Sequence, residues 1–92
     1  MTKPIHETEV EVRNPEGLHM RPAMQFVDIA NQYQSGIKVC KGDQSVDGKS
    51  IMQMMMLAAT SGTVLKIVAE GNDAPQALDA LETLIKGRFG EE

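Results

Sequence analysis

The hydrophobic residues of this chain switch between a two-residue and a 3.6-residue period, and this switching limits the folds that it can adopt. Residues 7–13 alternate, with glutamates on one side and apolar or small residues on the other, which predicts a half-buried strand. A helical period follows, with apolar residues at Met20, Ala23, Met24, Val27 and Ala30. This spacing predicts a helix that begins beside His19 and ends near residue 35.

The middle of the chain has the pattern of a hairpin followed by a short helix. Two β-favouring runs flank a Gly-Asp pair, which predicts a hairpin over residues 37–47. Ser50 and Gln53 have the spacing of a capping box, in which each side chain satisfies a backbone N–H at the start of a helix. We therefore predict a helix over residues 51–59.

The last third of the chain predicts one more strand and one more helix. Residues 63–70 alternate again, with inward positions at Leu65, Ile67 and Ala69. Asp73 is expected to cap a final helix, because a proline follows two positions later and a glutamine three positions later. The apolar face of that helix comprises Ala77, Leu78, Leu81, Leu84 and Ile85.

Together these elements predict an α+β fold. Their order is strand, helix, strand, strand, helix, strand, helix within 92 residues, a length typical of one domain. A sheet with its helices on one face forms an open-faced, two-layer sandwich. The opposite face would be open to water, which suits the glutamates of the first strand. We expect a single domain over residues 1–92, with a four-stranded sheet and three helices on one face.

Composition argues against several classes of function. The net charge of −4 and the aromatic content of 3% argue against nucleic-acid binding, which needs basic surfaces and stacking platforms. One cysteine and two histidines at unrelated positions form neither a disulfide framework nor a metal-ligand pattern, so we expect no metal and no cofactor. No apolar segment is long enough for a signal peptide or a bilayer span, so we expect a cytoplasmic location without membrane insertion.

The segment from Gly17 to Ala23 carries the chemistry best suited to a function. His19 is expected at a helix N-terminus, where N–H groups without partners and the positive end of the helix dipole favour an anion such as phosphate. A neutral imidazole is a nucleophile, and Arg21 can supply positive charge to phosphoryl oxygens. Gly17 permits a close backbone approach or a positive φ. The alternative is that His19 only caps the helix and that Arg21 is a solvated surface charge.

The same segment, Gly-Leu-His-Met-Arg-Pro-Ala over residues 17–23, resembles the active-site segment of the HPr family. These proteins are the histidine-containing phosphocarriers of the phosphoenolpyruvate-dependent phosphotransferase system. Residues 48–52 resemble the regulatory serine segment of the family, and the likeness extends over residues 5–89. Two motifs at the expected separation are more specific than either alone. The resemblance implies a fold of four antiparallel strands and three helices.

The resemblance also implies a phosphoryl carrier rather than an independent catalyst. His19 would accept a phosphoryl group on Nδ1 from phosphorylated enzyme I and pass it to enzyme II proteins of a sugar or nitrogen branch. Arg21 would hold the phosphoryl oxygens. Residues 56–59 and 88–92 look closer to the nitrogen-branch members of the family. We expect the carrier to be a monomer.

Ser50 and the helix that follows it have both a structural and a functional interpretation. Ser50 is an expected helix cap and, by resemblance, a site for HPr kinase/phosphorylase. The helix residues expected to face the core are Met54, Leu57 and Ala58. The outward positions, and therefore the expected partner-docking residues, are Ile51, Met52 and Met55, since flexible methionines suit surfaces that bind several partners. A regulatory binding module controlled at Ser50 is the alternative to a phosphoryl carrier.

Overall fold

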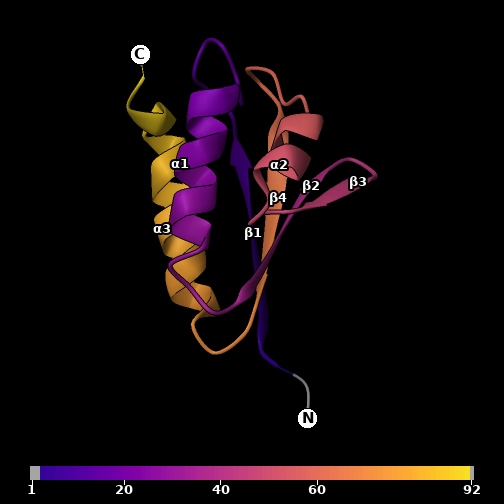
Figure 1. The fold of residues 1–92 in the computed structure, drawn as a ribbon, viewed down its shortest axis with the longest axis vertical. Helices are drawn as coiled ribbons and strands as arrows, with labels where there is room; N and C mark the ends of the chain where they lie inside the picture. Colours follow the sequence, from indigo (N-terminus) through magenta and orange to yellow (C-terminus); the bar gives the residue numbers. More distant parts are fainter. Residues whose placement is uncertain (1–2, 92) are drawn as a thin grey trace.

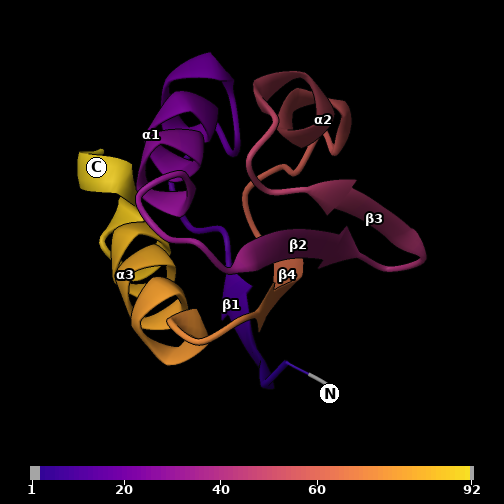
Figure 2. The same ribbon diagram turned by 60° about the horizontal axis from the view of Figure 1, so that its bottom comes forward.

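The structure, a computed structural model, describes residues 3–91 and contains one four-stranded sheet covered by helices (Figure 1). In chain order the elements are β1 (Ile5–Glu11), α1 (Met20–Ala30), β2 (Gly36–Lys41), β3 (Gln44–Asp47), α2 (Ile51–Met56), β4 (Val64–Glu70), α3 (Ala74–Lys86) and a short 3-10 helix, η1 (Arg88–Gly90). The sheet order is β1-β4-β2-β3, and every neighbouring pair is antiparallel. Figure 2 shows the α-helices gathered over one face of the sheet. The predicted α+β open-faced sandwich is confirmed.

Alternation along the strands explains why the two faces of the sheet differ. β1 pairs with β4 along its whole length, from Ile5 opposite Glu70 to Glu11 opposite Val64. The glutamates of β1 are exposed on the open face, as predicted. The β4 residues buried beneath the helices are Leu65, Ile67 and Ala69, also as predicted. The predicted apolar face of α3 completes this core, with Leu84 only partly buried.

Helix α1 is shorter than the sequence predicted, because it ends at Ala30 rather than near residue 35. The N–H groups of Gln34 and Ser35 do not continue the helix. They donate to the carboxylate of Asp73, each over 2.9 Å. A contact with a distant loop therefore replaces the last turn that local periodicity predicted.

The buried face of α1 also differs from the predicted one. Its buried residues are Pro22, Ala23, Phe26, Val27 and Ala30. The prediction of Met20 and Met24 as core residues is wrong, because both are exposed. Phe26 is the largest side chain on the helix and is fully buried, so its burial sets the rotation of the helix and turns the two methionines outward.

Helix α2 is also shorter than predicted, and only half of its capping box forms. It ends at Met56, and Ala58 then adopts a positive φ of 50°. The Ser50 hydroxyl accepts the N–H of Gln53 over 3.2 Å, as predicted. The Gln53 side chain does not return to Ser50 but accepts the N–H of Asp47 over 2.9 Å. This hydrogen bond ties α2 to the end of β3.

Asp73 occupies the predicted N-cap position of α3, but its carboxylate caps a different segment. It accepts the backbone N–H groups of Gln34 and Ser35 and the hydroxyl of Ser35 instead of an N–H of its own helix. The Ser35 hydroxyl first, and then the Gln34 N–H, hold the pKa of Asp73 below its ordinary value of 3.8. The carboxylate therefore joins the start of β2 to the start of α3.

Asp73→Asn is expected to destabilise the protein at neutral pH and to lose this effect in acid. A carboxylate whose folded pKa is lowered stabilises the fold above its unfolded pKa, near 3.8, and this contribution disappears as the pH falls through the lower folded pKa. Urea unfolding of both proteins across this pH range measures the difference. Asp79→Asn, at an exposed position of α3, controls for the loss of one negative charge. Equal free energies of unfolding at neutral pH would contradict the prediction.

Candidate functional site

His19 lies immediately before α1, as predicted. Its backbone is extended, with φ −84° and ψ −171°, and its carbonyl accepts the N–H of Ala23 over 3.0 Å, so it is the N-cap residue. Its side chain makes no capping hydrogen bond and is 35% exposed. His19 therefore caps the helix through its backbone carbonyl, and its imidazole takes no part in capping.

The loop before His19 is held by contacts that leave no room for a side chain at Gly17. Gly17 is buried with a φ of +70°, and a Cβ there would lie 2.5 Å from the carbonyl oxygen of Ala59. Leu18 donates its N–H to the same oxygen over 2.8 Å. Asn14, which is fully buried, donates its side-chain amide to the carbonyl of Gly17 over 2.6 Å. The predicted close approach at Gly17 is present, and its partner is the segment that follows α2.

Two carboxylates lie at the Nε2 atom of His19. Glu91 Oε2 is 3.0 Å from this nitrogen and Glu16 Oε2 is 3.5 Å from it. The side chain of Glu91 is 20% exposed, whereas that of Glu16 is 77% exposed. The second oxygen of Glu91, Oε1, accepts the side-chain amide of Asn14 over 2.9 Å.

The surroundings of Glu91 favour its charged form. The hydrogen bond from Asn14 lowers the pKa of Glu91 most, and the contact with His19 lowers it further, below its ordinary value of 4.5. The positive charge of Arg21 contributes in the same direction. Glu91 is therefore an ionised carboxylate at neutral pH, bound at both of its oxygens.

Glu91 could not be predicted from the sequence, because no local pattern marks it. It is 72 positions from His19 and comes just after η1. Figure 1 shows η1 beside the start of α1. Phe89, which is 3% exposed, anchors this segment in the core. Only the packing of η1 brings the carboxylate to the histidine.

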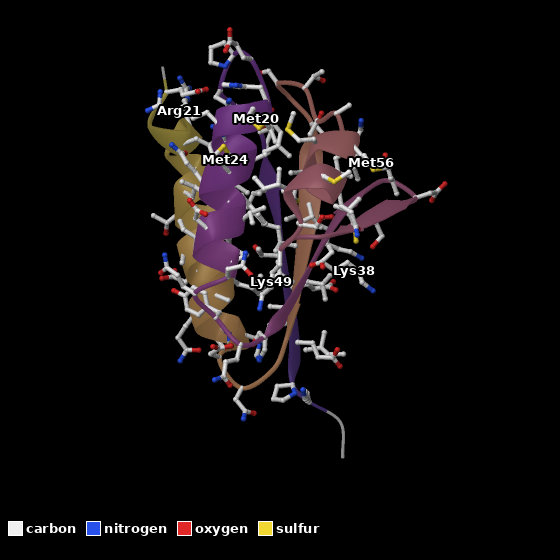
Figure 3. The ribbon with its side chains drawn as sticks, viewed as in Figure 1. Met20, Arg21, Met24, Lys38, Lys49 and Met56 are labelled. Atoms are coloured by element: carbon white, nitrogen blue, oxygen red, sulfur yellow. The ribbon has the colours of Figure 1, made fainter. Side chains whose placement is uncertain are left out.

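Arg21 lies in the first turn of α1, on the side of the helix that faces η1 (Figure 3). Its side chain is exposed and makes no ion pair or hydrogen bond with the rest of residues 3–91. Its positive charge contributes to the lowered pKa of Glu91, the carboxylate that contacts His19. The guanidinium is therefore available to an incoming anion.

Exposed methionines gather on the two helices beside His19. Met20 and Met24 project from α1 and Met56 projects from the neighbouring α2 (Figure 3). The exposed fractions are 54% for Met20, 47% for Met24, 78% for Met52 and 67% for Met56. We call these four residues the methionine surface. Contiguous exposed apolar patches are typical of protein–protein contact sites.

The predicted docking residues of α2 lie at different depths in the structure. Met52 is exposed as predicted, but Ile51 and Met55 are half-buried and pack against the core. The prediction of Ala58 in the core is wrong, because the helix ends before it and the residue is exposed. Met56 takes the outward place instead. The fully buried residues of this region are Met54 and Leu57, as predicted.

The described part of the chain contains neither a cluster of metal-ligating side chains nor a helix that could cross a membrane. Within residues 3–91, no group of three His, Cys, Asp or Glu side chains is arranged to hold a metal ion. Over the same range, no helix combines the length and the apolar character that crossing a membrane requires.

Known proteins match this chain over most of its length. A family model described as "PTS HPr component phosphorylation site" matches residues 6–87. The phosphocarrier protein HPr of Neisseria meningitidis serogroup A is 46% identical over 82 residues, which are 89% of this chain and 92% of that protein. The crystal structure of HPr-C-His from Thermoanaerobacter tengcongensis has a TM-score of 0.91 at 45% identity and covers 95% of this chain and 98% of its own. An HPr dimer structure from the same organism has a TM-score of 0.76 at 45% identity, covering 89% and 94%.

Proposed function

Because this chain belongs to the HPr family and is a phosphocarrier protein of the phosphotransferase system, we propose that His19 is the residue that carries the phosphoryl group. The observation that supports this assignment is a partly exposed imidazole at the start of a helix, with an exposed arginine two positions later. The other histidine of the chain, His6, lies within β1 opposite Ala69 and has no such surroundings.

In the proposed transfer, the lone pair on Nδ1 of His19 attacks the phosphorus atom carried by phosphorylated enzyme I. A new N–P bond forms on His19, and the donor's bond to phosphorus breaks with its electron pair returning to the donor. A second transfer of the same kind passes the group to an enzyme II protein. Such reactions depend mainly on positioning and on neutralising the charge of the phosphoryl oxygens.

Two features of this chain would neutralise that charge. The N–H groups of Met20 and Arg21 begin α1 and have no acceptor within the helix, and the helix dipole adds partial positive charge there. The Arg21 guanidinium adds a full positive charge and several donors. Glu16 and Glu91 contact the other ring nitrogen, Nε2, so a phosphoryl group on Nδ1 does not have to displace them.

Incubation with enzyme I and phosphoenolpyruvate tests the proposal. We expect a mass increase of one phosphoryl group that is lost in acid and retained in base, as a phosphoramidate requires. Fragmentation should place the group on the peptide that contains His19. An acid-stable group, or a group on another peptide, would contradict the assignment.

We propose that the methionine surface docks both enzyme I and the enzyme II proteins. Its residues lie on α1, which begins immediately after His19, and on α2, which packs against α1, and methionine side chains adapt to partners of different shape. We also propose that the monomer is the acting form, because His19, Arg21 and Glu91 all come from one chain. We also propose a cytoplasmic location, which the free thiol of Cys40 supports because thiols stay reduced there.

Arg21→Ala is expected to slow phosphoryl transfer about ten- to hundredfold without unfolding the protein. Hydrogen bonds to charged groups contribute about 1.5–3 kcal/mol, and about 1.4 kcal/mol corresponds to a factor of ten. The side chain is exposed, so its loss leaves no cavity. Rapid-quench measurement of transfer from enzyme I gives the rate. Arg13→Ala, at an exposed arginine that pairs with Glu11, is the matched control and should transfer at the wild-type rate.

We propose that Ser50 is a regulatory phosphorylation site, recognised by HPr kinase/phosphorylase. Ser50 is partly exposed at the start of α2, two positions before the exposed Met52. A phosphate there would be tolerated by the helix N-terminus, but it would place about −2 of charge beside the methionine surface. Phosphorylation would then weaken docking without unfolding the domain.

Two substitutions at Ser50 separate its structural role from its regulatory one. Ser50→Ala is expected to lower the free energy of unfolding by about 1 kcal/mol through loss of the cap, with transfer unchanged. Ser50→Asp keeps a capping oxygen and should retain stability, but its charge should slow transfer. Chemical denaturation and transfer assays measure the two effects. If both variants transfer like the wild type, charge at this position does not regulate docking.

A further inference from the structure

The Glu91 carboxylate contacts the ring nitrogen of His19 that does not take the phosphoryl group. We infer that Glu91 is a positioning residue, which holds the ring by Nε2 and keeps Nδ1 as the nucleophilic nitrogen. This inference rests on the proposed role of His19 and concerns how its ring is prepared for the reaction. The carboxylate comes from the segment after η1, outside the motif that carries the histidine.

The first argument is that the carboxylate is held in place from both sides. Oε2 lies 3.0 Å from His19 Nε2, and Oε1 accepts the amide of Asn14 over 2.9 Å. Asn14 is fully buried, and its amide nitrogen also binds the carbonyl of Gly17, 2.6 Å away. Both neighbours are acceptors, so the Asn14 amide can face them only with its nitrogen. Buried Asn14 therefore fixes the carboxylate relative to the loop that leads to His19.

The second argument is the anchoring of the segment that carries Glu91. The N–H of Glu91 donates to the carbonyl of Arg88 over 2.8 Å, which closes the turn at the end of η1. Phe89, inside this turn, is 3% exposed and belongs to the hydrophobic core. The backbone of the segment that carries the Glu91 carboxylate is therefore held in place on both counts. Glu16 lacks these restraints, since its carboxylate is 3.5 Å from the ring and mostly exposed.

The third argument concerns the position of the ring proton. A neutral imidazole has one N–H, and an ionised carboxylate can only accept a hydrogen bond. Nε2 must therefore carry the proton when it binds Glu91, which leaves the lone pair of the neutral ring on Nδ1. Among residues 3–91, the side-chain contacts of the ring lie at Nε2. The geometry thus selects the tautomer in which Nδ1 is the nucleophile.

The same contact assists both halves of the transfer. When Nδ1 of the neutral ring accepts a phosphoryl group, Nε2 keeps its proton and the ring becomes positively charged. The carboxylate of Glu91, already at Nε2, stabilises that charge. When the group leaves, the electron pair of the N–P bond returns to Nδ1 and the ring is neutral again. No proton has to enter or leave the ring during the cycle.

Nitrogen-15 NMR of the histidine ring tests the inference directly. In the unphosphorylated wild type at a pH where the ring is neutral, the shifts of Nδ1 and Nε2 should show the proton mostly on Nε2. Glu91→Ala should raise the fraction of the Nδ1–H tautomer and slow transfer from enzyme I about tenfold, the effect of one charge-assisted hydrogen bond. Glu91→Asp, which keeps the charge on a shorter side chain, should restore part of the tautomer preference.

Glu16→Gln is the matched control, because it removes the other carboxylate near the same nitrogen and should leave the tautomer unchanged. A wild-type ring protonated mainly on Nδ1 would overturn the inference, and this measurement needs no variant that has to fold. Wild-type tautomer populations and transfer rates in Glu91→Ala would also overturn it. Absence of any phosphoryl group on wild-type His19 would instead refute the proposed function, while the tautomer measurement would still decide the role of Glu91.

Discussion

Replacing His19 with glutamine is expected to abolish phosphoryl loading while the fold is retained. Glutamine has no nucleophilic nitrogen, so no N–P bond can form at this position. The wild-type ring is partly exposed and makes no capping hydrogen bond, so its loss leaves neither a cavity nor an uncapped helix. We expect the free energy of unfolding to change by less than about 1 kcal/mol, as at other sites outside the core. Mass spectrometry after incubation with enzyme I and phosphoenolpyruvate measures loading, and thermal unfolding measures stability.

The second histidine of the chain supplies the control for this experiment. His6→Gln makes the same chemical change at an exposed position of β1 and should load one phosphoryl group like the wild type. If His19→Gln still loaded an acid-labile group, or if His6→Gln did not load, the assignment of His19 would be wrong. A globally unfolded His19→Gln would contradict the expected independence of stability and function at this position.

Gly17→Ala is expected to displace the loop before His19, to destabilise the protein and to slow phosphoryl transfer. An alanine at the φ of +70° found here costs about 1–2 kcal/mol, and its Cβ would meet the carbonyl oxygen of Ala59 at 2.5 Å. The loop must shift to relieve this contact, and forced overpacking adds about 1–3 kcal/mol. Because the loop leads directly into His19, a displacement of about 1 Å can lower transfer about a hundredfold. Chemical denaturation and rapid-quench transfer assays measure the two effects.

A second glycine allows the strain at Gly17 to be separated from the clash. Gly42 has a similar φ of +57°, in the turn between β2 and β3, and a Cβ there would meet nothing within 4 Å. Gly42→Ala should therefore lower the free energy of unfolding only by the cost of an alanine at positive φ, about 1–2 kcal/mol, and leave transfer unchanged. Equal destabilisation in the two variants would show that the approach of Ala59 does not restrain the loop.

These two substitutions test different parts of the same site. His19→Gln removes the nucleophile and leaves its support in place, whereas Gly17→Ala keeps the nucleophile and moves its support. The inferred role of Glu91 lies between them, because this carboxylate contacts the ring itself and is tied through Asn14 to the Gly17 carbonyl. The three sets of measurements should therefore distinguish loss of the nucleophile, loss of the tautomer preference of the ring and displacement of the loop before His19.

Sequence periodicity predicted the order and type of the elements, because the burial of one face of a strand or helix imposes a pattern within a few neighbouring residues. The alternation in β4 puts Leu65, Ile67 and Ala69 under the helices, and that pattern is complete within seven residues. The position of His19 before α1 was likewise predictable, since Pro22 and the following apolar positions define the start of the helix. No distant part of the chain was needed for these predictions.

Helix ends were predicted less well, because their backbone groups bind to distant segments. Asp73 has the sequence pattern of a cap for α3, yet its oxygens accept the N–H groups of Gln34 and Ser35 and thereby end α1 early. Gln53 likewise binds the N–H of Asp47 instead of completing the capping box with Ser50. In both cases two acceptable hydrogen bonds were available to one side chain, and packing selected the nonlocal one.

The amino-acid sequence by itself determined the sandwich of strands and helices and the histidine at a helix start, because each depends on spacing within a few residues. Only the tertiary structure decided which carboxylate contacts that histidine and which methionines face outward. Glu91 reaches the ring because Phe89 is buried and carries η1 back to the start of α1. Met20 and Met24 are exposed because burial of Phe26 fixes the rotation of α1. Contacts of this kind depend on how complete elements pack together, which short-range periodicity does not specify.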